Sequence, residues 1–529
     1  MSMAASWTGT SLWRIQASRA RALPGLVVLL IGWELAARLL TDAFVLAGPT
    51  EVLAYLVEDR ALMARALGET LTNAAFGFVI GNVAAIALAA VALAWPRAER
   101  VVTGLALLVF CLPLVATGPI LRVLYGPGAG PQVTLAALAV YYTTLIPLLV
   151  GLRAAPSSWF DLVRSYGRGR FATLVHVRAM ASLPYFFAGL QIAAPAAFLG
   201  AMVGEFTGAE RGMGVLTVQA IRALDVEMTW GLATVATAVS ILAYIAIGAL
   251  GRRVLLDAPP VILAAPAGAS RGRLAAWVDA GLVTLIAVGA WWLALLAFGL
   301  NPFFAKGPGD VFAALVLDDD AAETRAALAA ALGETALFLI PGYLAGLLAG
   351  AGLAVLLILV PMIASSAMPL AIALRSVPIV TTAPLVVLLL GRGAVGTIVL
   401  VAVMVFFPTF VASLHGLRQA PGQIMDVFDS YAAGPVTRLL RVRIPAMLPA
   451  FFAAARMAVP ASVLAVTVVE WLATGNGIGS LMAISASLSD YDMLWSSVVL
   501  VSVLSALGYA AVGAVERRIL GTYAPEQLA

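Results

Sequence analysis

Charged residues are scarce in this chain. Asp, Glu, Lys and Arg make up 11% of the 529 residues, whereas hydrophobic residues make up 62%, and the mean hydropathy is +1.02. Soluble domains are about one quarter charged, so this composition excludes a soluble globular fold. The alternating pattern of a membrane β-barrel is also missing, because apolar residues run continuously and the breaks carry Gly, Pro or charge.

Reactive side chains are rare as well. Cys111 is the only cysteine, which excludes an intrachain disulfide and a thiolate metal cluster. His176 and His415 are the only histidines and are not in a metal-ligand spacing. The only lysine, Lys306, stands outside any Gly-rich phosphate-binding loop. The sequence therefore predicts no catalytic, metal or ATP site in this chain and no nucleic-acid partner, which leaves a membrane enzyme as the weakest alternative.

Apolar stretches of about 20 residues recur throughout, each long enough to cross roughly 30 Å of hydrocarbon as a helix. We predict an all-α polytopic membrane protein with about 12 transmembrane helices, six in each half. Their approximate ranges are 22–40, 70–94, 101–123, 132–152, 184–204, 230–250, 277–299, 335–359, 365–390, 394–415, 449–470 and 494–514. The first is expected to be a retained helix, because no small-residue cleavage pattern follows it.

A tandem repeat covers most of the chain. A shift of 265 positions aligns Gly68 with Gly333 and continues without a gap to Arg253 and Arg518, while the offset before Gly68 is 259. We predict a first domain over 1–256, a polar linker over 257–273 and a second domain over 274–529. Because each half has an even number of spans, both halves should have the same orientation.

The distribution of charge predicts the orientation in the membrane. With both termini in the cytoplasm, most of the 31 basic residues fall in cytoplasmic segments and most of the 27 acidic residues fall outside. This arrangement obeys the positive-inside rule, and its inverse does not.

Two polar segments lie at equivalent positions between the fourth and fifth spans, at about 157–183 and 422–448. They are too polar to cross the membrane, and we predict short helices that present apolar and basic side chains to a partner. For either segment taken alone, a loop that lies on anionic lipid is the alternative. The candidate coupling residues are Asp161, Tyr166, Gly167, Arg170, Asp426, Tyr431, Ala432 and Arg438.

These segments resemble the EAA loop of ABC importer permeases, in which an acidic residue and small residues are followed by a glycine. Asp161 and Asp426 stand where that pattern has Glu, and Ala432 replaces the glycine in the second copy. The resemblance implies two type I importer permease domains fused in one chain, so that no permease homodimer is needed. It also implies two ATPase subunits on the cytoplasmic side, one docked on each loop, which would bind ATP and Mg; no cofactor is expected in this chain.

The second half is similar to permeases of the nitrate, sulfonate and taurine type in its segments Leu374-Arg-Ser-Val-Pro378, Phe406-Phe-Pro408 and Gly475-Asn-Gly-Ile-Gly479. This resemblance implies an importer in the bacterial inner membrane that receives its solute from a periplasmic or lipid-anchored solute-binding protein. The expected solute is a small anion such as a sulfonate, taurine or nitrate, or a vitamin or pyrimidine precursor. The sequence does not identify it further.

Polar residues inside spans are candidates for the translocation pathway, because a charge at the bilayer centre costs about 3 kcal/mol and tends to face protein or water. They are Gln191, Arg375 and Arg456, and snorkelling to the membrane surface is the alternative for Arg456. Glu205 and Glu470, at outer span ends, are candidates for docking of the binding protein or for loop structure.

A secondary transporter with two six-helix repeats is the second hypothesis for function. Ion coupling would require carboxylates buried in the spans. Glu34 is the only clear candidate, and its counterpart in the second half is Leu293. That asymmetry argues against a coupled-ion mechanism.

Overall fold

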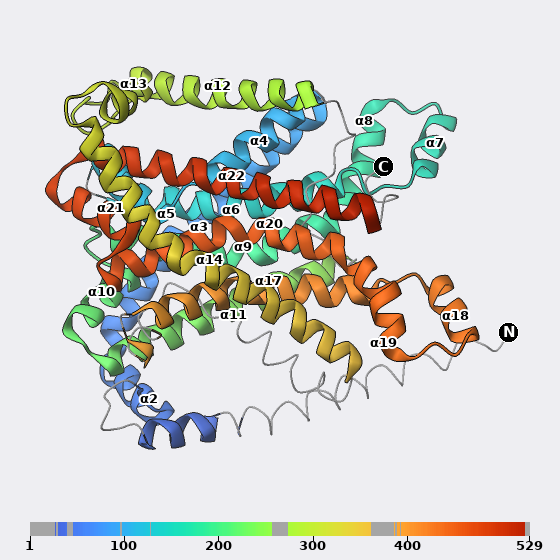
Figure 1. Ribbon diagram of the computed structural model, residues 1–529, viewed down its shortest axis with the longest axis horizontal. Helices are drawn as coiled ribbons and strands as arrows, with labels where there is room; N and C mark the ends of the chain where they lie inside the picture. Colours follow the sequence, from blue (N-terminus) through green and yellow to red (C-terminus); the bar gives the residue numbers. More distant parts are fainter. Residues whose placement is uncertain are drawn as a thin grey trace.

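The computed structural model describes residues 27, 30–39, 46–95, 98–126, 128–255, 273–360, 386, 389–391 and 393–523 (Figure 1). Within these ranges every regular element is helical, which confirms the all-α class predicted from composition. The linker residues 257–272, Arg375 and most of the predicted span 365–390 lie outside the described residues.

The first half is built from long helices joined by short ones. Its elements are α2 (Pro49–Glu58), α3 (Arg60–Ala94), α4 (Ala98–Phe110), α5 (Leu114–Tyr125), α6 (Gly130–Gly151), α7 (Ser157–Ser165), α8 (Arg170–Thr173), the π-helix η2 (Leu174–Ala179), α9 (Met180–Phe206), α10 (Met213–Ala223) and α11 (Val226–Val254). α8, η2 and α9 form one continuous helix over Arg170–Phe206.

The second half follows this order in its described residues, which leave out most of the segment between α14 and α17. Its elements are α12 (Arg273–Ala297), α13 (Pro308–Phe312), η3 (Ala313–Leu317), α14 (Ala321–Leu359), α17 (Ala394–Arg418), α18 (Gly422–Ser430), α19 (Pro435–Arg438), η4 (Leu439–Arg443), α20 (Ile444–Val469), η5 (Glu470–Thr474), α21 (Gly477–Leu488) and α22 (Tyr491–Tyr523). Among the described residues nine helices are long and apolar enough to cross a membrane, or ten if the bent pair α4–α5 is one span. The predicted spans 22–40 and 365–390 are described only in part, so the total of twelve stays a prediction.

The third predicted span, 101–123, is not a straight helix. It breaks between α4 and α5, whose axes meet at 91°. Pro113 lies at the break: it has no N–H to donate, and its ring disfavours a helical conformation at Leu112. The hydropathy of the apolar stretch did not predict this bend, because hydropathy does not depend on which backbone groups can form hydrogen bonds.

The sixth span of each half begins at the same cap. The Asp225 carboxylate accepts the Met228 N–H at 2.9 Å, and the Asp490 carboxylate accepts the Met493 N–H at 3.0 Å. Such side chains satisfy amide groups that have no partner in the first turn of a helix. The repeat seen in the sequence is therefore preserved at the level of single hydrogen bonds.

Both halves run in the same direction. α7, α8, α18 and α19 lie at one end of the molecule, on the right in Figure 1, and α10 and α21 lie at the other end. This agrees with the even number of spans predicted for each half. The cytoplasmic position of the end that carries α7 and α18 stays a prediction.

Small residues allow the long helices to pack closely. Gly342, Gly346 and Gly350 of α14 face α17, and a Cβ at Gly346 would lie 2.6 Å from the carbonyl oxygen of Ala402. Gly77 of α3 faces α6 in the same way in the first half. Because lipid tails are as apolar as leucine, close backbone approach of this kind supplies much of the association energy between membrane helices.

The two halves share core packing. Val115 of α5 and Val203 of α9 lie in one buried cluster with Val466 and Val469 at the end of α20. At the other contact, α12 lies along α4, where Arg100 and Asp279 form an ion pair of 2.6 Å. The fused halves are therefore in direct contact over several helices.

Replacing Gly346 by Val should destabilise the protein, because the new side chain meets the backbone of α17. Overpacking of this kind costs about 1–3 kcal/mol, and we expect the melting temperature in detergent to fall by several degrees. Gly352→Val is the matched control, since Gly352 lies on the exposed side of the same helix with no heavy atom within 4 Å of an added Cβ. Equal shifts for the two variants would contradict the packing argument.

Candidate functional site

Two helical hairpins protrude from the same end of the molecule (Figure 1). The first hairpin consists of α7 and α8, and the second hairpin consists of α18 and α19. Each begins after a proline at the N-cap, Pro156 or Pro421, in extended backbone. Each continues through a π-helix, η2 or η4, into the fifth span of its half. A helix that begins as a protruding hairpin and ends inside the bundle can transmit movement between the two.

The turn inside each hairpin has the same backbone geometry despite a different residue. Gly167 has φ +66° and Ala432 has φ +49°, both in the left-handed region. The amide of Arg168 bonds to the Val163 carbonyl oxygen at 3.2 Å, and the amide of Ala433 bonds to that of Phe428 at 2.9 Å. This is the pattern of a helix C-terminus closed by a left-handed residue. Alanine holds it at a cost of about 1–2 kcal/mol that glycine avoids.

Both hairpins expose large apolar side chains. The exposed fraction reaches 75% for Tyr166 and 82% for Tyr431. The other exposed apolar residues, in equivalent pairs, are Trp159 and Ile424, Leu162 and Val427, and Phe171 and Val436. Contiguous apolar patches on protruding elements are typical of interaction sites. Tyr166 and Tyr431 were predicted as coupling residues. In the sequence, Tyr166 lies between the exposed Leu162 and Phe171, and Tyr431 lies between the exposed Val427 and Val436.

The two hairpins differ in charge. In the first, the exposed carboxylate of Asp161 lies 3.7 Å from the Arg164 guanidinium, and Arg170 is exposed at the start of α8. In the second, Arg438 pairs with Asp429. Asp429 escaped the sequence analysis, although it stands at the position where the first hairpin has Arg164. The reversal of charge at this position was the signal that could have identified it.

At the opposite end of the molecule, a glutamate and a threonine hold a loop in each half. We call these groups the glutamate clasps. In the first clasp, Glu205 accepts the Thr70 hydroxyl at 3.0 Å and the Gly214 N–H at 2.7 Å, and Thr70 accepts the Met213 N–H at 2.9 Å. The clasp therefore ties α3, α9 and the first turn of α10 together.

The second clasp repeats this geometry 265 residues later. Glu470 accepts the Gly479 N–H at 2.9 Å, and Thr335 accepts the Ile478 N–H at 2.9 Å. Glu334 adds a bond that the first clasp lacks, since its carboxylate accepts the Gly477 N–H at 2.8 Å. Each clasp places a carboxyl group at the N-terminus of a short helix, where one of its oxygens accepts a backbone amide that has no partner within the helix.

Both clasp glutamates are buried, with 1% of Glu205 and 2% of Glu470 exposed. Glycines provide the necessary space: a Cβ at Gly212 would lie 2.2 Å from the Glu205 carboxyl carbon, and one at Gly477 would lie 2.2 Å from Glu470 Oε1. Their burial directs both side chains toward α10 and α21, and their predicted part in docking a solute-binding protein stays a prediction. They hold the structure of α10 and α21, which was the other role considered for them.

The polar candidates in the fifth spans contact the sixth span of their own half. Gln191 Nε2 donates to the Tyr244 carbonyl oxygen at 3.2 Å. Arg456 forms an ion pair of 3.1 Å with Glu516, and its guanidinium lies 5.6 Å from the centre of the Tyr509 ring. Both charged side chains are mostly buried, with 17% and 12% exposed. Arg456 is therefore paired with a carboxylate of the sixth span, and its place on the translocation pathway stays a prediction.

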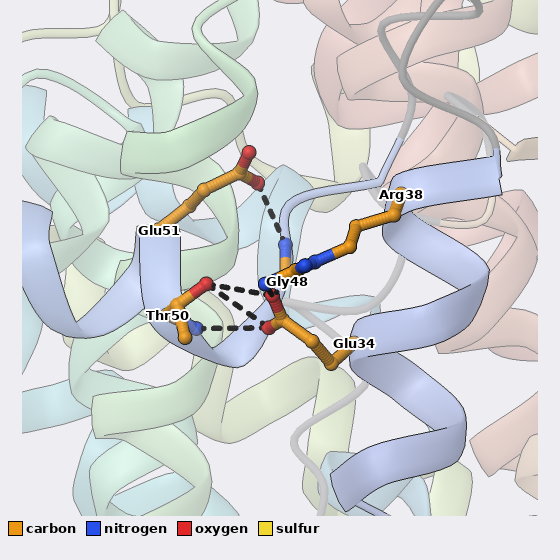
Figure 2. Close-up of polar contacts among 5 residues, drawn as sticks. All are labelled: Glu34, Arg38, Gly48, Thr50 and Glu51. Carbon is orange, nitrogen blue, oxygen red and sulfur yellow. Dashed lines mark hydrogen bonds and ion pairs between the residues drawn. The ribbon is translucent and has the colours of Figure 1, made fainter.

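Glu34, the acidic residue that a coupled-ion mechanism would need, is occupied at the junction with α2. Figure 2 shows its carboxylate accepting the Thr50 hydroxyl at 2.8 Å and the Thr50 N–H at 3.2 Å, with Arg38 3.0 Å away. The neighbouring Gly48 N–H donates to Glu51 at 2.8 Å. Glu34 and Glu51 together satisfy the first turn of α2, so the carboxylate of Glu34 has a local structural task.

The chain matches one protein family twice. Residues 81–256 and residues 342–521 each match the family described as binding-protein-dependent transport system inner membrane component. The two matches end 265 residues apart, which is the offset of the internal repeat.

Several permease proteins are similar to parts of the chain. The chain is 30% identical over 179 residues to a probable ABC transporter permease protein of Haemophilus influenzae, which covers 34% of this chain and 71% of that protein. It is 28% identical over 152 residues to the formylaminopyrimidine transport permease protein ThiX of Halalkalibacterium halodurans, covering 29% of this chain and 61% of that one. It is 27% identical over 144 residues to the putative aliphatic sulfonates transport permease protein SsuC of Escherichia coli, covering 27% and 55%. The last two alignments thus span less than two thirds of the relative.

Replacing Glu470 by Ala should free the first turn of α21, because the buried Gly479 N–H loses its acceptor. An unsatisfied buried donor costs about 1–3 kcal/mol. We expect faster amide hydrogen exchange at Ile478 and Gly479 and a lower melting temperature, with a smaller effect for Glu470→Gln, which keeps an acceptor oxygen.

The control for this experiment is Glu323→Ala, which removes an exposed carboxylate from the first turn of α14. It should leave exchange in α21 unchanged. Wild-type exchange at Gly479 in Glu470→Ala would show that the carboxylate does not hold the loop.

Proposed function

Because the chain belongs to the binding-protein-dependent transport system inner membrane components, the permease family of ABC transporters, we propose that it forms both halves of the transmembrane pathway of an ATP-driven importer in the bacterial inner membrane. Two ATPase subunits dock on it, one on each hairpin, and hydrolyse ATP outside this chain. The observation that carries this proposal is the pair of equivalent hairpins, which expose apolar side chains at the same end of the molecule.

The fifth spans supply the mechanical link between the ATPases and the outer end of the pathway. One continuous helix runs over Arg170–Phe206, so it begins in the first hairpin and carries Glu205 near its other end. The second, Pro435–Leu472, carries Glu470 in the same way. At 1.5 Å per residue such a helix is about 55 Å long. Displacement of a hairpin by an ATPase therefore moves the clasp at the far end of the same helix.

The clasps hold two short helices in positions where a solute-binding protein could dock. Each holds a short helix, α10 or α21, against the second predicted span of its half, α3 or α14. We assign docking of the binding protein to these two helices, with Glu205 and Glu470 acting indirectly because they fix the position of the helices. A rigid docking surface loses less entropy on association than a mobile loop.

The solute class follows the relatives. A sulfonate permease and a formylaminopyrimidine permease are both similar to this chain, so we propose a small anion of the sulfonate, taurine or nitrate kind, or a vitamin or pyrimidine precursor. A role for Arg456 in binding an anion requires separation from Glu516, whereas Gln191 offers only a neutral amide. Arg375 stays a candidate for the pathway.

Transport by the reconstituted complex tests the proposed function directly. With the ATPases, the binding protein and the chain in proteoliposomes, we expect uptake of a labelled solute that requires MgATP and stops with a non-hydrolysable analogue. A proton gradient alone should not drive uptake. Uptake driven by that gradient in the absence of ATP would identify a secondary transporter instead.

Docking on the first hairpin is tested by Gly167→Val. A β-branched residue disfavours φ +66°, at a cost of about 1–2 kcal/mol or more. We expect co-purification of the ATPase to fall roughly tenfold while the chain still reaches the membrane.

Gly169→Val is the matched control for docking. Gly169 lies two residues away in extended backbone, with φ −77°, and an added Cβ meets no atom within 4 Å. Valine is tolerated in that conformation. ATPase assembly that is equally unaffected by both substitutions would count against the first hairpin as the docking element.

A further inference from the structure

A cavity of about 250 Å³ lies where the ends of α3 and α6 meet the start of α4 and the π-helix η2. It is separate from the exposed patches of the hairpins and from the clasps. Its apolar wall includes Leu93, Leu149 and Leu152, and its polar rim consists of Glu99, Arg153 and Arg178. An apolar wall beside converging charges is the composition expected of a ligand site.

The rim carries more positive than negative charge. Arg153 pairs with Glu99, whose side chain is 13% exposed. Arg178 forms no ion pair among the described residues and lies with its guanidinium 5.4 Å from the centre of the Phe160 ring. Partial burial, and next the positive charge of Arg178, lower the pKa of Arg153. Two guanidinium groups therefore share a partly desolvated space with a single carboxylate, and a bound anion relieves their repulsion.

The internal repeat shows that the arginines do not depend on Glu99. Arg418 and Arg443 stand at the positions equivalent to Arg153 and Arg178, whereas the position equivalent to Glu99 is Ala364. Ala364 itself lies outside the described residues. An arginine pair that recurs without the acid has a purpose besides neutralising that acid.

The position of the cavity favours one kind of anion. It lies at the ends of two membrane-spanning helices, where α3 stops at Ala94 and α6 at Gly151, on the side of the molecule that carries the hairpins. In the orientation predicted from charge, this is the level of the phospholipid headgroups of the inner leaflet. Guanidinium groups bind phosphate through paired hydrogen bonds, and the leucines suit the glycerol and first methylene groups of a lipid.

We propose that this cavity binds the phosphate group of an anionic phospholipid of the inner leaflet, with Arg178 and Arg153 as its ligands and Glu99 as an internal competitor. Binding at this site would also steady the first hairpin, because Phe160, which packs under Arg178, belongs to α7. That consequence rests on the proposed function, whereas phosphate binding does not.

Native mass spectrometry of the full chain in detergent tests the site without any ATPase. We expect phosphatidylglycerol to be retained in preference to phosphatidylcholine, and Arg178→Gln to reduce that retention about tenfold. Glu99→Gln should increase it several-fold, because Arg153 is then released to the ligand. Loss of folding cannot produce this gain, so the two variants together separate a binding role from a structural one.

Arg164→Gln is the charge-matched control, since Arg164 lies in α7 of the neighbouring first hairpin, is exposed and pairs with Asp161 away from the cavity. It should bind phosphatidylglycerol as the wild type does. Displacement of the lipid by inorganic phosphate would show that a soluble phosphate is the physiological source for the same site. Wild-type retention in Arg178→Gln, or weaker retention in Glu99→Gln, would overturn the proposal, and neither result bears on ATPase docking.

Discussion

Hydrocarbon offers no hydrogen-bond partner, and this constraint governs the whole molecule. A chain that is 62% hydrophobic can cross it only with every backbone group bonded internally, as a helix does. The constraint becomes acute where helices end near the membrane, because the first amides of a helix have no internal acceptor. In the glutamate clasps and the aspartate caps of α11 and α22, side-chain carboxyl oxygens accept these amides. The same groups fix where each loop lies.

The fifth spans connect the hairpin end of the molecule with the clasp end. In each half, the fifth span joins a hairpin at one end of the molecule to a buried glutamate at the other, so a single continuous helix contacts both ends. Close packing at glycines of α3 and α14 limits how these helices can bend. Between the halves, the contact at α5 and α20 consists of apolar side chains, and the contact at α4 and α12 includes an ion pair.

Hydropathy and the repeat were sufficient to predict the helical class, most of the spans and the two hairpins, because these depend on composition and on order along the chain. The bend at Pro113 was missed, since a run of apolar residues looks the same whether its helix is straight or broken. Pairs such as Arg456 with Glu516 depend on which faces of two helices meet, which no spacing within one helix reveals. The burial of Glu205 could have been predicted from the sequence. Thr70 and the segment Gly212-Met-Gly214 recur together with it in the second half, at the repeat offset of 265 residues.

The two halves keep some local features in common and differ in others. The clasp, the aspartate cap and the left-handed turn keep their geometry in both halves, even where alanine must adopt the conformation of a glycine. Charged residues differ at equivalent positions of the repeat. Arg164 corresponds to Asp429, Gln191 to Arg456, and Glu99 to Ala364. In a homodimer a substitution changes both copies of a site, but in one chain each copy can change alone. The shared features are backbone caps and turns, whereas the divergent ones are charged or polar side chains of the hairpins, the fifth spans and the cavity rim. The two halves of the fused chain therefore repeat their backbone caps and turns and differ in their charged side chains.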